Sequence, residues 1–466
     1  MKKITKRTLG AAIGALCMSV TMLSSVAFAA EDPGYTYTAI SGSKIHAEKY
    51  LVMDDEANVP NVTFKYSIRA GRAITGEYNT SESTVTLPVW AGNDASKVTG
   101  QPTIGTAKFT AGQTTFEEPQ DNENDDIQNK DGSAAKLKDE VHLADDGSQK
   151  YARSKIEVDF SNVQFKEPGI YRYVITETRT GVLRGTKTIL EADDAIVYDE
   201  DDSRILDVYV IDDNGVLKIQ GYVLHNTTEE GTVLENGTSQ QPTKTDGFEN
   251  IYLTEDLTLK KKVAGNQASR DEYFEFTVKI SNAIPGTVYD VVDTSPDPNA
   301  QTFDRTTKTN GINTVSHTNA TRLVTGADGT VTTTFWLQGN QSLKICGLAK
   351  STSYSINENK AAMDTESYEV TATISGDTNY SDQPGSTNGS GIAIALDDAS
   401  VSGAAAYRMD DNYIQNDTVV TYTNTKVGII PTGVSLAILP GAAAAVAGAA
   451  GLGVLAARKR KKEAEG

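Results

Sequence analysis

The sequence has few of the residues that most often carry catalysis or metal binding. Its 466 residues include only two cysteines, two tryptophans and four histidines. Two cysteines allow at most one disulfide and exclude a thiolate metal cluster. The histidines show no metal-ligand spacing, and neither a nucleophile elbow nor a pair of catalytic carboxylates is present; they are His46, His142, His225 and His317. We therefore expect no cofactor, no metal and no enzyme acting on an external substrate.

Basic residues are also in deficit. The chain has 43 Lys and Arg against 62 Asp and Glu, a formal charge of −19. Phosphate binding needs a basic face, so this balance argues against a nucleic acid partner. Positive charge gathers at the two ends, before residue 30 and after Thr432. The segment between them is therefore a strongly acidic body.

The N-terminal end has the three parts of a secretory signal peptide. A basic head from Lys2 to Arg7 precedes an apolar stretch, Leu9 to Leu23, and the small-x-small site Ala27-Phe28-Ala29. This order predicts a signal peptide over residues 1–29, cut after about Ala29.

The two cysteines have different expected fates. Cys17 lies in the signal peptide, and a lipoprotein site there is disfavoured because Gly14 stands where leucine is typical. Cys346 would then be the one cysteine of the mature chain, which therefore has no internal disulfide. A lone cysteine in a strand-rich segment is typical of packed core.

The C-terminal end, residues 426–466, contains a short pattern, an apolar span and a basic tail. Ile429 to Gly433 reads IIPTG, Val434 to Ala457 is uncharged and mostly apolar, and Arg458 to Lys462 is basic. The span and tail alone fit a single-pass transmembrane anchor. Together the three parts resemble a sortase sorting signal of the variant xVPTG kind, without the usual leading Leu-Pro. That resemblance implies attack of a transpeptidase thiolate on the Thr432–Gly433 bond, which leaves Thr432 as an acyl-enzyme.

Residues 35–425 carry the pattern of an all-β protein. Apolar and polar residues alternate in short runs rich in Thr, Val, Tyr and Ile, with Gly, Asn and Asp between them. Asp213-Asn214-Gly215 and Ala327-Asp328-Gly329 suit tight hairpins, and β-sandwiches are the commonest solution for such a chain. The polar stretch from Glu117 to Gly132 fits no EF-hand spacing and favours a solvated insertion loop over a calcium site.

Four short patterns occur twice in the same order, which predicts two copies of one domain. The pairs are Ile45–Lys49 with Leu257–Lys261, Phe64–Ile68 with Phe274–Val278, Tyr173–Glu177 with Tyr354–Glu358, and Phe248–Asn250 with Tyr422–Asn424. We expect domains at 30–252 and 253–425. Only six residues separate Asn250 from Leu257, so the domains should be stiffly joined end to end.

Strand periodicity places one lysine, one glutamate and one asparagine inside each domain. Residues i, i+2 and i+4 share one face of a strand. Each of these polar residues shares a face with the apolar residues of its own repeat; they are Lys49, Glu177 and Asn250, and Lys261, Glu358 and Asn424. Because buried charges are normally excluded unless they are paired, the alternative is that these side chains emerge into water at the strand ends. The recurrence of the same pattern in both copies, in the same order, disfavours that alternative.

These patterns, with the PTG terminus, resemble the FctA-type backbone pilins of Gram-positive bacteria. The resemblance implies two tandem CnaB-type, immunoglobulin-like sandwiches, each closed by a spontaneous Lys–Asn isopeptide bond that a glutamate assists. The first bond would join Lys49 to Asn250 with Glu177, and the second Lys261 to Asn424 with Glu358. The region around residues 72–150 makes the first domain longer than the family pattern.

Burial supplies the chemistry for such a bond. A dry site favours neutral forms, lowering the pKa of the lysine and raising that of the glutamate. A neutral amine is nucleophilic, and a protonated glutamate could hydrogen-bond the carboxamide oxygen and pass a proton to departing ammonia. Contact between amine and amide supplies effective molarity. The reaction consumes its own residues, so it is single-turnover self-modification.

The same resemblance implies a covalent polymer on the cell surface. Its partners would be a sortase, other pilin subunits, peptidoglycan and a host surface receptor. The acceptor lysine lies, in the family, just before the last strand of the first domain, and Lys244 falls within one residue of that place. A solvated loop lysine is the alternative for Lys244, and a monomeric wall-anchored adhesin is the alternative for the whole protein.

Overall fold

The computed structural model describes most of the two expected domains. It describes residues 38–39, 42–79, 84–111, 143–144, 147–179, 182–184, 187–189, 195–226, 243–270, 272–296, 304–309, 312–359, 368–376, 392–394, 396–401, 404–408 and 412–428. The predicted signal peptide, the loop from Glu117 to Gly132 and the predicted sorting signal lie outside these residues. In the described part, no helix combines the length and the hydropathy that a membrane crossing requires.

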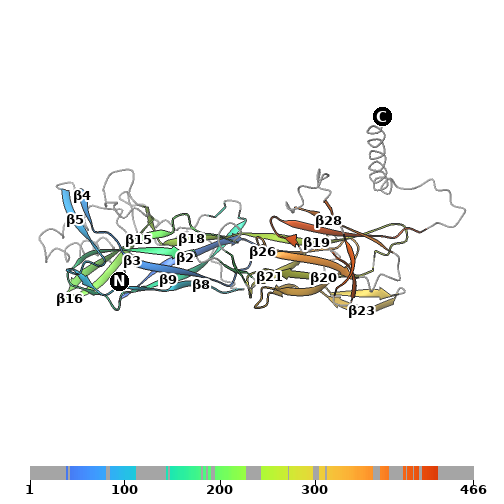
Figure 1. The fold of residues 1–466 in the computed structure, drawn as a ribbon, viewed down its shortest axis with the longest axis horizontal. Coiled ribbons are helices and arrows are strands. Elements are labelled where there is room, and N and C mark those ends of the chain that lie inside the picture. Colours follow the sequence, from blue (N-terminus) through green and yellow to red (C-terminus); the bar gives the residue numbers. More distant parts are fainter. Residues whose placement is uncertain are drawn as a thin grey trace, which may run out of the picture.

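All regular structure in the described residues is β-strand, so the all-β prediction is confirmed. The strands form two bodies that follow one another along the long axis of the molecule (Figure 1). Each body consists of two main sheets that face each other across an apolar core. The architecture is a tandem pair of β-sandwiches.

The first body contains a nine-stranded and a five-stranded sheet. The larger sheet has the order β1-β16-β15-β11-β3-β8, with β17 on β16, β5 on β11 and β4 on β5. Its strands are β1 Thr38–Ala39, β3 Val62–Ala70, β4 Ile74–Asn79, β5 Thr84–Ala91, β8 Thr106–Phe109, β11 Gly169–Thr178, β15 Ser203–Asp213, β16 Val216–Asn226 and β17 Thr243–Thr245. The facing sheet has the order β14-β18-β2-β9-β7: β2 Lys44–Asp54, β7 Thr103–Ile104, β9 Gln149–Asp159, β14 Ile196–Val197 and β18 Gly247–Tyr252. Two small ladders pair β6 Val98–Thr99 with β10 Gln164–Phe165, and β12 Val182–Arg184 with β13 Lys187–Ile189.

The second body contains a seven-stranded and a six-stranded sheet. The first has the order β24-β21-β26-β19-β33-β28-β29: β19 Thr254–Ala264, β21 Val288–Asp293, β24 Arg322–Val324, β26 Ser342–Ala349, β28 Glu369–Ser375, β29 Ile392–Ile394 and β33 Thr418–Thr425. The second has the order β25-β20-β27-β31-β30, with β32 on β27: β20 Phe274–Ser281, β25 Val331–Leu337, β27 Ser353–Asn359, β30 Asp397–Val401, β31 Ala404–Arg408 and β32 Asn412–Tyr413. A separate hairpin pairs β22 Asp304–Thr309 with β23 Ile312–Thr318.

Part of the extra region at residues 72–150 extends the larger sheet of the first body. The hairpin β4–β5 pairs with β11 in parallel, with Val89 opposite Ile170. The strand β5 pairs with Ile170–Arg172 of β11, and β3 pairs with Tyr173–Thr178. These two strands therefore lie one after the other along the same edge of β11. The insertion therefore builds on the sandwich without displacing the strands that carry the repeated patterns.

One of the two predicted hairpin turns is confirmed and the other connects different sheets. Asn214 and Gly215 have positive φ angles of 57° and 87° between the paired strands β15 and β16, as a tight hairpin requires. The turn at Ala327-Asp328-Gly329 joins β24, which pairs with β21, to β25, which pairs with β20. The hairpin prediction was wrong there because the chain crosses from one sheet to the facing one at this turn, which local turn chemistry does not reveal.

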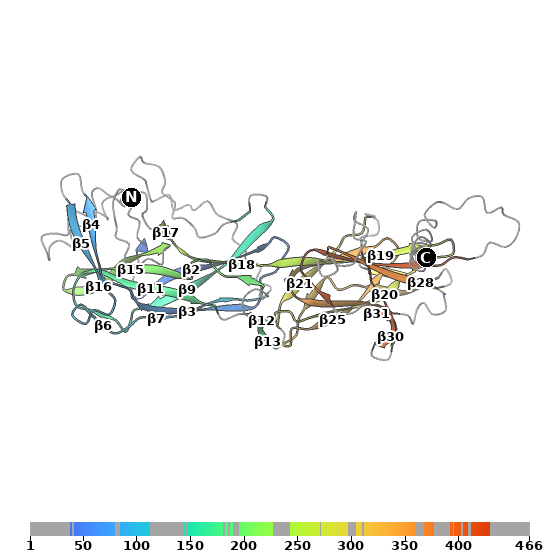
Figure 2. The same cartoon turned by 45° about the horizontal axis from the view of Figure 1, so that its top comes forward.

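The two bodies share a short and well-packed junction. A single residue, Leu253, separates β18 from β19, and Figure 2 shows the one strand leading directly into the other. The Leu253 N–H donates to the Ala195 carbonyl of the first body, and its carbonyl accepts from Lys350 of the second. Ile284 and Ala349 of the second body pack into the core cluster of the first. These contacts agree with the expected stiff end-to-end connection.

Candidate functional sites

In each body the first and last strands that carry the repeated patterns are parallel neighbours. Lys49 on β2 lies opposite Phe248 on β18, and Lys261 on β19 lies opposite Tyr422 on β33. The two registers are the same, and each asparagine stands two residues beyond the aromatic residue. Lysine and asparagine are therefore diagonal neighbours on one face of adjacent strands, within reach of one another's side chains.

The first site brings Lys49, Glu177 and Asn250 into contact inside the first sandwich. Lys49 Nζ donates to Glu177 Oε2 at 2.9 Å, and Asn250 Nδ2 donates to Glu177 Oε1 at 3.1 Å. Lys49 and Asn250 are fully buried, and Glu177 is 3% exposed. One carboxylate thus holds both partners, with a separate oxygen for each.

The second site repeats this arrangement with Lys261, Glu358 and Asn424. Glu358 Oε1 accepts from Lys261 Nζ at 2.6 Å and from Asn424 Nδ2 at 2.9 Å. All three side chains are 1% exposed or less. Among the described residues, the other carboxyl oxygen of Glu358 has no hydrogen-bond partner.

Aromatic rings surround both lysines. Lys49 Nζ lies 5.0 Å from the ring centre of Phe64 and 5.8 Å from that of Phe248. In the second site, Lys261 Nζ lies 4.0 Å from Phe274 and 5.5 Å from Phe276. These rings exclude water from the amines, and three of them come from the repeated patterns at Phe64–Ile68 and Phe274–Val278.

Burial changes the protonation of both amines. It lowers the pKa of Lys49 and that of Lys261 to about 8, although Glu177 and Glu358 act in the opposite direction. In the second site burial also raises the pKa of Glu358, against its hydrogen bonds to Lys261 and Asn424. A substantial fraction of each amine is therefore neutral near pH 8, and a neutral amine is a nucleophile.

The structure changes one detail of the mechanism expected from sequence. The expectation had the glutamate hydrogen-bonded to the carboxamide oxygen of the asparagine. In the first site that oxygen, Asn250 Oδ1, instead accepts from the backbone N–H of Asp199 at 2.9 Å, and Glu177 contacts the carboxamide nitrogen. A backbone N–H can only donate, so its partner must be the oxygen, and the amide nitrogen is left facing the glutamate.

A third cluster of lysine and carboxylates lies at the junction and differs from the two sites in its exposure. Lys344 Nζ pairs with Asp256 Oδ2 at 2.8 Å and also with Glu56, and its side chain is 20% exposed. Partial burial lowers its pKa, but the hydrogen bonds to the two carboxylates outweigh this effect and raise it. This amine remains an ammonium and therefore cannot act as a nucleophile.

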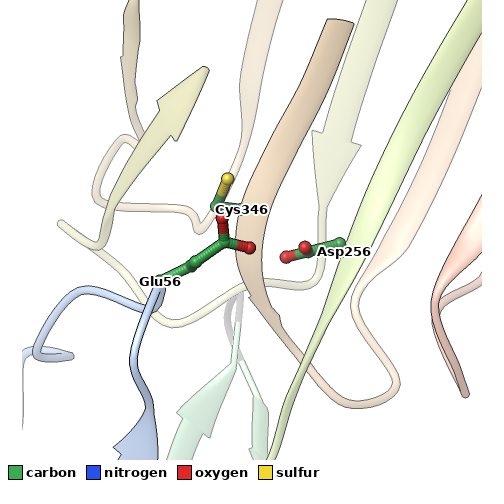
Figure 3. Close-up of side chains that lie close together, drawn as sticks. All are labelled: Glu56, Asp256 and Cys346. Atoms are coloured by element: carbon green, nitrogen blue, oxygen red, sulfur yellow. The ribbon is translucent and has the colours of Figure 1, made fainter. Parts of the chain in front are cut away.

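The same cluster offers three potential metal ligands. One ligand atom from each of Glu56, Asp256 and Cys346 lies within 4.8 Å of the others (Figure 3). Burial raises the pKa of the Cys346 thiol to about 12, and the Lys344 ammonium already neutralises the carboxylates. The cluster is therefore an ion-pair contact between the two bodies, and Cys346 is packed core as predicted.

Sequence reasoning missed three residues around the first site. The Tyr66 hydroxyl donates to Glu177 Oε1 at 3.3 Å, the Asp199 N–H donates to Asn250 Oδ1, and Arg204 donates to the Asp199 carboxylate. Tyr66 stands in a repeated pattern and its strand parity could have revealed it. Asp199 lies in an irregular segment after β14, where no periodic signal exists.

The remaining predicted functional residues are only partly described. The backbone of Lys244 lies in β17 opposite His225, and its side chain is outside the described part. Thr432 and Gly433 are also outside it. Of the four histidines, His46 is exposed and His225 is buried against Asp207.

The fold and the sites define a class of protein: tandem β-sandwiches, each with a lysine, a glutamate and an asparagine in contact inside its core. Residues 45–253 match the FctA family, described as a Spy0128-like isopeptide containing domain. The first domain is thus of the FctA type, and the resemblance seen in the sequence is confirmed there. Residues 255–392 match a different model, a domain of unknown function (DUF7601). Among curated proteins, none matches the chain.

Several solved structures are similar to the chain at low sequence identity. The major pilin of Streptococcus pyogenes has 18% identity, covers 84% of this chain and 100% of its own, and gives a TM-score of 0.42. The major pilin T-13 of Streptococcus pyogenes has 18% identity, covers 84% of this chain and 100% of its own, and gives a TM-score of 0.40. The major pilin T3.2 of that organism has 18% identity, covers 84% of this chain and 99% of its own, and gives a TM-score of 0.41.

Proposed function

We propose that this chain is the backbone subunit of a covalently assembled surface pilus on a Gram-positive cell wall, with one Lys–Asn isopeptide bond closing each domain. The observation that carries the proposal is the pair of buried lysine, glutamate and asparagine sets at equivalent positions of two sandwiches. The FctA-type match of the first domain supports it.

The bond-forming step follows from the contacts of the first site. Neutral Lys49 Nζ attacks Asn250 Cγ, and the C–N bond to Nδ2 breaks. Glu177 contacts both nitrogens, so it takes one proton from Nζ and delivers one to Nδ2, which leaves as ammonia. One amide replaces another, so no oxidant or cofactor is needed. Glu358 has the same role between Lys261 and Asn424.

Intact mass of the mature chain tests the two bonds. Each bond releases one ammonia, so the wild type should weigh about 34 Da less than its formula, about 17 Da for each bond. Glu177→Ala should keep only the second bond and Glu358→Ala only the first, because each glutamate serves one site. Lys260→Ala, next to Lys261 on the opposite face, is the control and should keep both bonds. A wild-type mass equal to the formula mass would refute the proposal.

Assembly depends on residues that frame the second domain. A sortase would cleave between Thr432 and Gly433 and transfer the Thr432 acyl group to the Lys244 amine of the next subunit. The consecutive strands β18 and β19 lead from just after Lys244 through the second domain, and β19 runs parallel to the last described strand, β33. This continuous route suits a subunit that transmits tension. The pilus would be joined to peptidoglycan at its base and could present a surface to a host receptor.

The size distribution of wall extracts tests assembly. The wild type should give a ladder of high-mass species, and Lys244→Ala should collapse it to one band because the acceptor amine is gone. Lys218→Ala removes an exposed lysine of β16 and should leave the ladder unchanged. A single band from the wild type would instead favour a monomeric wall-anchored adhesin.

A further inference from the structure

The carboxamide of Asn250 is held from the side opposite Glu177 by a segment that the reaction above does not use. This segment, residues 198–202, follows β14 and runs beside β18. The Asp199 N–H points to Asn250 Oδ1 at 2.9 Å. When an amine attacks the Asn250 carboxamide carbon, negative charge develops on this oxygen, so the Asp199 N–H lies where a transition-state donor is needed.

A buried arginine fixes the position of that N–H. Arg204 is fully buried, and its Nη2 donates to Asp199 Oδ2 at 2.6 Å. Its other nitrogens donate to backbone carbonyls on both sides of the site, Asp201 at 2.6 Å and Gly247 at 3.0 Å. The guanidinium also lies 4.7 Å from the ring centre of Phe248. Arg204 therefore ties the segment to the strand that carries Asn250.

The Asp199 side chain completes the connection. Its Oδ2 also accepts from the Glu249 N–H at 3.0 Å, one residue before Asn250. Its Oδ1 accepts from the Asp201 N–H at 3.1 Å, which closes a local turn. With both carboxyl oxygens engaged, rotation of the Asp199 peptide away from Asn250 would break several hydrogen bonds at once.

We propose that the Asp199 backbone N–H is the oxyanion donor for isopeptide formation in the first domain, and that Arg204 is the residue that positions it. This inference rests on the proposed function, since it concerns the same Lys49–Asn250 reaction. Attack of Lys49 Nζ converts the planar carboxamide to a tetrahedral intermediate with its charge on Oδ1. The Asp199 N–H stabilises that charge until Nδ2 leaves with the proton from Glu177.

The test compares rates of bond formation in the full chain made by cell-free synthesis and quenched in acid at intervals. The crosslinked peptide that contains Lys49 and Asn250 is measured by mass spectrometry. Asp199→Pro removes the N–H, and Asp199→Ala removes only the carboxylate. We expect the first bond to form about 100-fold more slowly in Asp199→Pro, the typical cost of one oxyanion donor, and to be less affected in Asp199→Ala. The Lys261–Asn424 bond of the same molecules is the internal control and should form at the wild-type rate.

The pH dependence separates this role from a structural one. The rate should rise through the pKa of Lys49, about 8, in the wild type. In both Asp199 variants the midpoint should stay at this pH or fall slightly, because the amine remains buried and the Asp199 carboxylate, which both variants lack, raises the pKa of Lys49. An Asp199 variant that opened the site to water would move the midpoint up towards the ordinary lysine value, and such a move would overturn the inference. So would a wild-type rate in Asp199→Pro, or equal slowing in Asp199→Pro and Asp199→Ala.

A second variant keeps the test decisive if Asp199→Pro does not fold. Arg204→Met keeps an apolar chain over Phe248 but removes the Arg204 hydrogen bonds to Asp199, Asp201 and Gly247, which tie residues 199–201 to β18. It should slow the first bond and spare the second, and a wild-type rate for the first bond would overturn the inference. Absence of both bonds from the wild type would instead refute the proposed function, so the two failures are distinguishable.

Discussion

At the residue scale, the chemistry of this protein depends on how deeply each charged group is buried. Lys49, Lys261 and Lys344 each contact a carboxylate, yet their pKa values move in opposite directions. Full burial lowers the pKa of Lys49 and that of Lys261, whereas the pKa of the partly exposed Lys344 is raised, so Lys344 keeps its proton. Contact with a carboxylate alone therefore does not make a lysine reactive; removal of water does.

A second buried charge network in the first domain should control its acid stability. Arg172 donates two hydrogen bonds to Asp207, at 2.8 and 2.7 Å, and His225 adds a third contact at 3.2 Å. Burial opposes ionisation of Asp207, but these partners outweigh it and lower its pKa to about 2. Because the folded-state pKa is depressed, the stabilisation is complete above about pH 4 and is lost as the pH falls towards 2.

Substitution of Asp207 tests this network. Asp207→Asn should cost about 3 kcal/mol at pH 7, because Arg172 is left buried without its countercharge, and the first domain should become less sensitive to pH between 4 and 2. Denaturant unfolding at several pH values measures both effects. Asp213→Asn, which breaks an exposed pair with Lys218, is the control and should change stability little. An unaltered acid profile in Asp207→Asn would contradict the assignment.

At the scale of elements, the parallel pairs β2–β18 and β19–β33 determine where a covalent bond would resist force. A load that enters just before β18 and leaves after β33 passes through β18 and β19 and across to β33. A Lys261–Asn424 bond would lie on this path. A Lys49–Asn250 bond would lie beside it, because β2 is not between the two points of attachment.

Single-molecule pulling between position 244 and residue 428 tests this path. Lys261→Ala should make the second domain extensible, whereas Lys49→Ala should mainly lower thermal and protease stability. The Lys260→Ala chain should behave as the wild type. Equal extension in the Lys49→Ala and Lys261→Ala variants would show that the load follows another route.

Sequence periodicity predicted the strands and which of their side chains are buried, because the alternation of apolar and polar residues along a strand is a local property. The parity of Lys49, Glu177 and Asn250, and of their equivalents, follows from the strand repeat, and all six are buried. The oxyanion candidate Asp199 could not be predicted, since an irregular segment acquires its position only from Arg204 and β18. The route of the chain at Ala327-Asp328-Gly329 was equally hidden, because turn chemistry does not specify which sheet receives the next strand.

At the scale of the molecule, the junction determines how the two domains move relative to one another. Gly347 has a φ of 67°, and a side chain there would come within 2.5 Å of the Ala57 backbone. Lys344 pairs with Glu56 across this contact, and Asn58 donates to Asp290 at 2.8 Å. Backbone contact, ion pair and hydrogen bond all cross between the domains, which limits bending.

Removal of Lys344 should loosen the junction without unfolding either domain. In Lys344→Ala the carboxylates of Glu56 and Asp256 repel one another, and small-angle scattering should show a broader distribution of overall length. The free energy of unfolding should change by about 1 kcal/mol or less, since the pair is partly exposed. Lys218→Ala provides the matched control within one domain. Identical scattering from Lys344→Ala and the wild type would assign the stiffness to Leu253 and Gly347 instead.

The placement of each reactive pair also sets an order of events during synthesis. Lys49 precedes almost all of its domain, and Asn250 stands on β18, where that domain ends; Lys261 and Asn424 are placed in the same way. Neither of the proposed bonds could form until the ribosome has made the closing strand. Until then the nascent polypeptide would be unbranched and able to pass through a narrow export channel, and covalent closure would follow completion of the fold.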